Sequence, residues 1–434
     1  MEKTLFLRSV NISGIKNIEK KIEIEFYGKN INKGFKADRN NVKGIYGENG
    51  TGKTAIITAV NIVKEFLFND NYLRDSHNQT LLRELINKNS REFIFKCEFV
   101  THVELFLIYE YEVHLLLDEN DEVYVSYESL KYQKNSNKNK QMTLFICNNG
   151  EFEALDIIES MKNAVIEKTR NLLTKQSALF LIFMILGKDG DKDALSIYYI
   201  CPVLFFMLIF VYFDREDKHT DYLKKNKLNE LKNNLSADEL MKELLKEIPT
   251  NEKRILKRDY SDYVNRIQQL ERFVRLFKPD LKRIDIDKTE DKDYYECRLL
   301  MDYGSYRVDK EFESTGIKKI IELYDAFVQA ANGFIVFIDE MDSNINDIYL
   351  CKLIEYVKYY GKGQMCFTSH NVDPMSVLKE NNKSIDFLTR DNRIVPWIKN
   401  GHYTPENSYR NGLIEGMPYN IDSSDFISIF ERGE

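Results

Sequence analysis

Residues 47–54, which read Gly-Glu-Asn-Gly-Thr-Gly-Lys-Thr, constrain the fold more than any other part of this chain. They fit the pattern G-x-x-x-x-G-K-[ST] of a phosphate-binding loop. Residues 42–46 before them are rich in strand-forming side chains, and residues 55–63 after them are an apolar helix candidate. A strand, a glycine-rich turn and a helix N-terminus aim several backbone N–H groups at one anion. The pattern therefore predicts a nucleoside-triphosphate site on an α/β sheet.

The same segment, here called the phosphate loop, predicts which residues hold the triphosphate. Lys53 would reach the β- and γ-phosphates and assist catalysis, and the Thr54 hydroxyl would bind Mg²⁺. The expected ligands are ATP or GTP with Mg²⁺. The alternative is a glycine turn that happens to precede a lysine. The residues expected to contact the nucleotide are Gly47, Glu48, Asn49, Gly50, Thr51, Gly52, Lys53 and Thr54.

Composition restricts the class of protein without indicating a reaction. A chain of 434 residues can hold one large domain or two to three ordinary ones. Its net charge of −7 provides no overall basic field for nucleic acid, although a local basic stripe remains open. The six cysteines are widely spaced without a CxxC pair, which favours free thiols over a zinc site. Since the N-terminus also lacks a signal-peptide apolar segment, we expect a cytoplasmic protein.

Residues 194–213 form an apolar run without a charged side chain, and its length matches a membrane span. Three tyrosines and the central Pro202 weaken the membrane interpretation. Acidic residues flank the run on both sides, so no positive-inside bias appears. A buried helix and a subunit interface are the alternatives. We expect an oligomer interface and no membrane span.

The spacing of apolar residues predicts an α/β chain in three parts. The N-terminal lobe, residues 1–150, is expected to contain strands at 4–12 and 21–27, a helix at 54–68, a polar stretch at 69–89, and a β-meander at 91–100, 103–117, 123–131 and 142–147. Residues 151–280 are expected to form a helical insert or oligomerisation region, with helices at 226–247 and 253–277. The C-terminal lobe, residues 281–434, is expected to contain helices at 313–329 and 347–360 and strands at 281–286, 294–303, 333–338, 364–368, 384–388 and 393–397.

The strand predicted at 333–338 ends in two acids, Asp339 and Glu340, called here the acid pair. Asp339 at the strand's carboxyl end can hold the Mg²⁺ shell. Glu340 would face the γ-phosphate and polarise the attacking water. The alternative is an apolar strand that meets a charged loop by chance. The acid pair therefore predicts the catalytic half of a triphosphate hydrolase.

A second apolar strand, predicted at 364–368, is followed by Ser369 and His370. Two parallel strands joined by a helix form a βαβ unit with a right-handed crossover, which brings His370 to the same sheet edge as the acid pair. His370 could then hydrogen-bond the γ-phosphate, although a structural histidine is the alternative. Upstream, Ser314 and Gly316 stand at a helix start, where a hydroxyl and N–H groups can meet a phosphate. An ordinary serine N-cap explains them equally well.

The order of these motifs resembles that of ABC-type ATPase heads. It is most similar to the branch that contains structural-maintenance-of-chromosomes (SMC) proteins and the OLD-like and PARIS-like antiphage-defence ATPases. Residues 5–17 also resemble that branch's first strand, and residues 339–346 resemble its D-loop. The resemblance covers residues 1–68 and 281–397. It implies an ABC-type head with a mixed sheet and an antiparallel β subdomain, here with a helical insert domain.

The resemblance further implies ATP as the nucleotide and a homodimer or higher oligomer. The phosphate loop of one copy would hold ATP, and Ser314 and Gly316 of the other copy would cover it. This chain lacks the second glycine of the usual Ser-Gly-Gly, and Asn346 stands where a His or Asp is common. Gln79 is a weak candidate for the family's Q-loop glutamine, with an exposed loop residue as the alternative.

The leading hypothesis is an ATPase that acts as an oligomeric sensor or scaffold in prokaryotic antiviral defence. It would control a separate effector protein, because the chain shows no nuclease acids beyond the ATPase set and no catalytic Cys-His or Ser-His-Asp arrangement. The alternative is an SMC-like DNA-repair ATPase that binds DNA directly, for which residues 253–282 supply a locally basic stretch. Such a stretch is more commonly a solvated helical face. A membrane-associated protein is a third hypothesis and depends on residues 194–213 alone.

Overall fold

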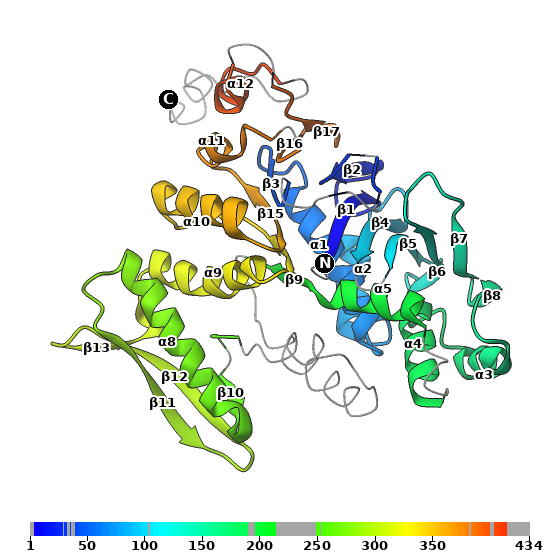
Figure 1. Ribbon diagram of the computed structural model, residues 1–434, viewed down its shortest axis with the longest axis horizontal. Coiled ribbons are helices and arrows are strands. Elements are labelled where there is room, and N and C mark those ends of the chain that lie inside the picture. The colour runs from blue at the N-terminus through cyan, green and yellow to red at the C-terminus, as the bar shows by residue number, and fades with distance from the viewer. Residues whose placement is uncertain are drawn as a thin grey trace, which may run out of the picture.

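A computed structural model describes residues 4–28, 30–32, 35, 40–102, 105–189, 196–213, 249–251, 253–381, 383–399 and 403–414. Three sheets and their covering helices account for most of these residues (Figure 1). The helix predicted at 226–247 lies outside the described residues. The three-part division of the chain stays a prediction.

A six-stranded sheet carries the phosphate loop. Its strand order is β17-β16-β3-β15-β14-β9, and all strands but the antiparallel edge strand β17 run parallel. The strands predicted in the C-terminal lobe are confirmed within a few residues. Every residue of β3, β14, β15 and β16 is buried, as expected of parallel strands covered on both faces. The bounds are β3 Val42–Tyr46, β9 Ile209–Tyr212, β14 Ile335–Ile338, β15 Gln364–Ser369, β16 Ile385–Leu388 and β17 Ile394–Pro396.

Helices cover both faces of this sheet because successive strand side chains point to opposite sides. In β14, Ile335 and Phe337 join the core that contains α1 (Lys53–Phe68). Val336 and Ile338 join the core that contains α9 (Thr315–Ala331) and α10 (Asp347–Tyr360). Figure 1 shows α9 and α10 on one side and α1 on the other. Two short helices follow, α11 Met375–Leu378 and α12 Pro405–Arg410.

A seven-stranded antiparallel sheet confirms the predicted meander. Its order is β2-β1-β4-β5-β6-β7-β8. The predicted polar stretch at 69–89 contains an unpredicted helix, α2 (Ser76–Leu85), whose first turn is capped by the Asp75 carboxylate accepting from Asn78 N. The strand bounds are β1 Thr4–Ser13, β2 Ile22–Glu25, β4 Glu92–His102, β5 Phe106–Leu117, β6 Val123–Lys134, β7 Met142–Asn148 and β8 Glu151–Leu155.

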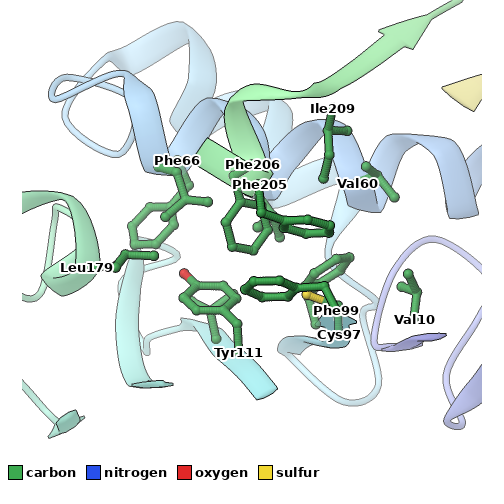
Figure 2. Close-up of a cluster of buried hydrophobic side chains, with 14 of the residues drawn as sticks. Val10, Val60, Phe66, Cys97, Phe99, Tyr111, Leu179, Phe205, Phe206 and Ile209 are labelled. Carbon is green, nitrogen blue, oxygen red and sulfur yellow. The ribbon is translucent and has the colours of Figure 1, made fainter. Parts of the chain in front are cut away.

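Residues 196–213 of the apolar run belong to the core of the chain itself. Its described part forms α5 (Ile197–Met207) and then β9, which pairs with β14. The Phe205 ring stacks on Phe99 of the meander at 3.9 Å between centroids (Figure 2). The side chains of this run that cover the antiparallel sheet are therefore not available to an oligomer interface, and the role of the run in oligomerisation stays a prediction. None of the helices described here is long and apolar enough to cross a membrane. The preceding helices are α3 Glu159–Thr169 and α4 Ala178–Asp189.

A third sheet corrects the predicted helix at 253–277. Residues 254–256 form strand β10 against β12, so helix α8 (Tyr260–Phe277) begins only after a 3-10 turn, Lys257–Asp259. The basic side chains of this region lie beside acids: Arg254 pairs with Asp291, Lys257 with Glu290 and Arg298 with Asp287. Among the described residues, six of the nine basic side chains at 253–282 lie within 4 Å of a carboxylate, so most of this stretch is balanced by acids. The bounds are β10 Arg254–Leu256, β11 Arg283–Glu290, β12 Tyr294–Asp302, β13 Arg307–Asp309 and the 3-10 turn Lys310–Phe312.

A buried ion pair lies inside the six-stranded sheet. Lys43 Nζ on β3 lies 2.6 Å from the Asp386 carboxylate on β16, and both side chains are almost fully buried. Burial raises the pKa of Asp386, and the Lys43 ammonium opposes that change. We expect Lys43→Met to lower the free energy of unfolding by about 3–5 kcal/mol, because Asp386 would lose its cation. Urea unfolding measures this loss.

The matched control for Lys43 is the exposed pair between Lys88 and Glu84. Lys88→Met should change the free energy of unfolding by no more than about 0.5 kcal/mol. The double variant with Lys43→Met and Asp386→Leu should recover most of the stability, because no unpaired charge remains buried. A Lys43→Met protein as stable as the wild type would contradict the prediction.

Candidate nucleotide-binding site

Strand register brings the predicted site residues to one edge of the six-stranded sheet. Ser369 on β15 pairs with Tyr46 on β3, and Ile338 on β14 pairs with Phe367. The residues that follow these strands, Gly47, His370 and Asp339, therefore leave the sheet at its carboxyl edge. In parallel α/β sheets this edge is where ligands bind.

Two glycines shape the phosphate loop. Gly50 and Gly52 have φ angles of 79° and 108°, in the left-handed region that favours glycine. A Cβ on Gly52 would approach Asn17 Oδ1 to 2.8 Å, so a side chain there would also collide with the neighbouring loop. The Thr51 hydroxyl donates to the Glu48 carbonyl at 3.0 Å and closes the turn. The loop thus has the curled backbone that the motif predicts.

Three side chains from outside the motif hold the phosphate loop. Asn17 Nδ2 donates to the Gly50 carbonyl at 2.8 Å, and Asn392 Nδ2 donates to the Thr51 carbonyl at 3.1 Å. The Arg390 guanidinium binds the Glu48 carboxylate at 2.8 Å. The sequence interpretation assigned no role to any of the three. Their contacts depend on chain segments that are distant in sequence, so no local pattern marks them.

Lys53 lies under the phosphate loop at the start of α1. It is 5% exposed, and its Nζ donates to the Gly47 carbonyl at 2.7 Å and to the Glu48 carbonyl at 2.8 Å. Burial lowers the pKa of Lys53 to about 8, while the carboxylates of Glu340 and Asp339 oppose this shift. Lys53 is therefore still mostly in its ammonium form at neutral pH. Thr54 follows in the first turn of α1, half-buried.

One threonine holds both residues of the acid pair. The Thr368 hydroxyl donates to Asp339 Oδ1 at 2.6 Å and accepts from the Glu340 backbone N–H at 2.8 Å. Asp339 is buried, and Glu340 is partly exposed with a φ of 44°. Thr368 was not predicted. A buried hydroxyl in an otherwise apolar strand is the signal that could have found it, because such a group needs a polar partner.

His370 lies exposed beside the acid pair, on a turn that Asp342 organises. The Asp342 carboxylate accepts from the backbone N–H of His370 at 3.2 Å and from that of Asn371 at 3.0 Å. Partial shielding of the imidazole from water and the neighbouring Lys53 lower the pKa of His370, against the opposite effect of the surrounding carboxylates. The lowered pKa favours a neutral imidazole, which can donate one hydrogen bond to an anionic ligand.

Ser314 and Gly316 lie at the start of α9. Ser314 is exposed and caps the helix, its hydroxyl oxygen accepting from Ile317 N at 3.4 Å. A Cβ on Gly316 would approach the Asn344 carbonyl to 2.9 Å, so this turn packs against the segment after the acid pair. Within the described residues, no hydrogen bond joins this turn to the phosphate loop of the same chain. Its assignment to a neighbouring copy's site stays a prediction.

Gln79 is neither a loop residue nor available to a metal. It lies in α2, half-buried. Its Nε2 donates to the Leu73 and Val123 carbonyls at 2.6 and 2.9 Å, and its Oε1 accepts from Val123 N at 2.8 Å. Both ends of the amide are therefore used by the main chain. The exposed-loop alternative is wrong, and the Q-loop assignment gains no support.

Comparison with solved structures finds neighbours at 13% sequence identity. An SMC head bound to the C-winged helix domain of ScpA aligns over 90% of this chain and 98% of that chain, with a TM-score of 0.39. The SMC head domain from Thermotoga maritima aligns over 91% and 100%, with a TM-score of 0.34. The recombination mediator RecF with ATPrS aligns over 92% and 99%, with a TM-score of 0.37. No family model matches the chain, and no curated protein matches it. At these TM-scores the neighbours support no conclusion about function, which must come from the residues themselves.

Proposed function

We propose that this chain binds ATP with Mg²⁺ and hydrolyses it. The observation that carries the proposal is the convergence of Lys53, the acid pair and His370 at the carboxyl edge of one parallel sheet. The left-handed glycine angles of the phosphate loop support it independently.

The donor set fits a magnesium ion. Mg²⁺ prefers oxygen ligands, and the Asp339 carboxylate and the Thr54 hydroxyl supply them at the expected sheet edge. When bound, the ion would neutralise charge on the β- and γ-phosphates. Lys53 would bind the same phosphates and release its two loop carbonyls. Glu340 would orient the attacking water and accept its proton, and neutral His370 would donate to the γ-phosphate.

A second copy of the chain would complete the site. Among the described residues, no hydrogen bond joins Ser314 or Gly316 to the phosphate loop of their own chain, and Ser314 is exposed. Phe312, two residues before Ser314, is a large apolar side chain that is 82% exposed. A partner that covered this side chain would gain stability by burying its apolar surface. The proposed assembly is a homodimer or higher oligomer that traps ATP between heads.

The proposed biological role is an oligomeric sensor or scaffold in prokaryotic antiviral defence that controls a separate effector. This role is supported by the order of motifs alone. The DNA-repair alternative requires a basic surface, and the ion pairs around α8 disfavour it. Salt-dependent binding of duplex DNA to the purified chain would reverse that preference.

Release of phosphate from ATP by the full chain tests the proposed function. We expect phosphate release to require Mg²⁺ and to stop when the metal is chelated. Thr54 and Asp339 carry no positive charge, so they can act on the phosphates only by holding the ion. Thermal stabilisation by ATP should accompany binding. A protein that neither binds nor hydrolyses ATP or GTP would overturn the proposal.

Phe312→Asp is expected to weaken the nucleotide-dependent dimer. Burying one phenylalanine side chain contributes about 1.5–3 kcal/mol, and a symmetric dimer loses two, so the dimer dissociation constant should rise by more than about 10-fold. Analytical ultracentrifugation with ATP in the hydrolysis-deficient Glu340→Gln background measures it. Leu81→Asp, at an exposed apolar residue of α2, is the matched control and should leave dimerisation unchanged. Equal effects of Phe312→Asp and Leu81→Asp on dimerisation would show that Phe312 does not lie in the dimer interface.

Thr368→Val should lower kcat by about 10- to 100-fold, because the isosteric change removes two hydrogen bonds that orient the acid pair. The matched control is Thr101→Val, at a buried threonine whose hydroxyl has no partner among the described residues. That variant should retain full turnover. Steady-state ATPase kinetics separate the two, and equal kcat in both variants would contradict the role given to Thr368.

A further inference from the structure

We propose that Lys319 is a positioning residue for Glu340 and links its orientation to the first turn of α9. This inference deepens the proposed function and rests on it. Lys319 lies on α9, one turn after the exposed Ser314, yet it is 5% exposed. Its Nζ donates to the Glu340 backbone carbonyl at 3.1 Å. A buried ammonium on that carbonyl is a strong, charge-assisted contact.

The backbone of Glu340 is held from both sides. Its N–H donates to the Thr368 hydroxyl at 2.8 Å, and its carbonyl accepts from Lys319. Between these contacts Glu340 has a φ of 44°, in the left-handed region that is unfavourable for a residue with a side chain. Such a conformation persists only where neighbours impose it. Because the backbone sets where the carboxylate points, loss of the Lys319 contact would release Glu340 without removing it.

A second contact joins α9 to the same segment. Gly316 packs so closely against Asn344 that a Cβ would lie 2.9 Å from the Asn344 carbonyl. The first turn of α9 therefore touches the chain after the acid pair at Asn344, and its second turn touches it at Glu340. A shift of the Ser314 turn, such as a partner's nucleotide would cause, must then alter the support of Glu340. This geometry couples the surface of one head to the catalytic carboxylate of the same head.

Lys319→Met tests the inference because it removes the ammonium and keeps the length of the side chain. With the full chain and saturating ATP, we expect kcat to fall about tenfold or more, while KM changes less than about threefold. Lys319→Arg keeps a cationic donor and should recover most of the lost kcat. If Lys319 only stabilised the fold, Lys319→Arg would not restore kcat while KM stayed unchanged.

Lys358→Met is the matched control. Lys358 is also a largely buried lysine whose Nζ donates to a main-chain carbonyl, that of Val377 at 2.6 Å, but on α10. It should keep the wild-type kcat whatever its effect on thermal stability.

The outcomes separate the inference from the function on which it rests. A wild-type chain with no more ATPase activity than Glu340→Gln overturns both. An active wild type together with an unimpaired Lys319→Met overturns the inference alone. The inference is also overturned if Lys319→Arg does not restore kcat, the Lys319→Met protein has a lower melting temperature, and Lys358→Met loses kcat to the same extent.

Discussion

Glu340→Gln is expected to lower kcat for ATP hydrolysis by about 10²–10⁴-fold, the usual contribution of a positioned general base. Glutamine has the shape of glutamate but cannot accept the proton of the attacking water. Asp339 and Thr54 remain, so Mg²⁺ and ATP should still bind, with affinity within about threefold of the wild type. Since ATP would then persist between the heads, the dimer should be more stable than that of the wild type.

Two measurements check this expectation. Single-turnover hydrolysis reports the chemical step, and sedimentation with ATP reports the dimer. Glu355→Gln makes the same chemical change on α10, where Glu355 pairs with Lys352. That control should hydrolyse ATP at the wild-type rate. Undiminished turnover in Glu340→Gln would falsify the assignment of Glu340 as the base.

The parts of the site that could be predicted are those encoded locally. The phosphate loop is a continuous motif, and its glycine angles follow from the need to curl the backbone. The acid pair follows an unbroken apolar strand, which ends where a buried sheet must meet solvent. The meander was predictable because its strands alternate and its turns are short.

What could not be predicted depends on contacts between distant segments. The four residues of β9 end an apolar run, and periodicity cannot distinguish a short buried strand from helix. Strand β10 exists because residues 254–256 pair with β12, forty residues later in the chain. The role of Thr368 requires the register of β14 on β15. Helix α2, by contrast, carried a visible cap at Asp75 that the prediction overlooked.

Lys53→Ala should weaken ATP binding by about 2–3 kcal/mol, or roughly 30- to 140-fold, because a charge-assisted contact with the phosphates is lost. Lys64→Ala is the matched control on the same helix, where Lys64 lies over the Phe210 ring. It should leave the affinity unchanged. Equilibrium binding of a fluorescent ATP analogue measures the affinity of both variants. Unchanged affinity in Lys53→Ala would show that the phosphate loop does not bind the nucleotide.

The pH dependence of ATP binding is a second test of the role of the Lys53 ammonium. Burial lowers its pKa to about 8, so the ammonium is present at pH 7 and is lost as the pH rises through 8. A triphosphate binds the charged form, and affinity should therefore fall above pH 8, approaching tenfold per pH unit. In Lys53→Ala this dependence should disappear, because no group remains to lose its charge there. A wild-type affinity that stays constant from pH 7 to 9.5 would show that the Lys53 ammonium does not bind the nucleotide.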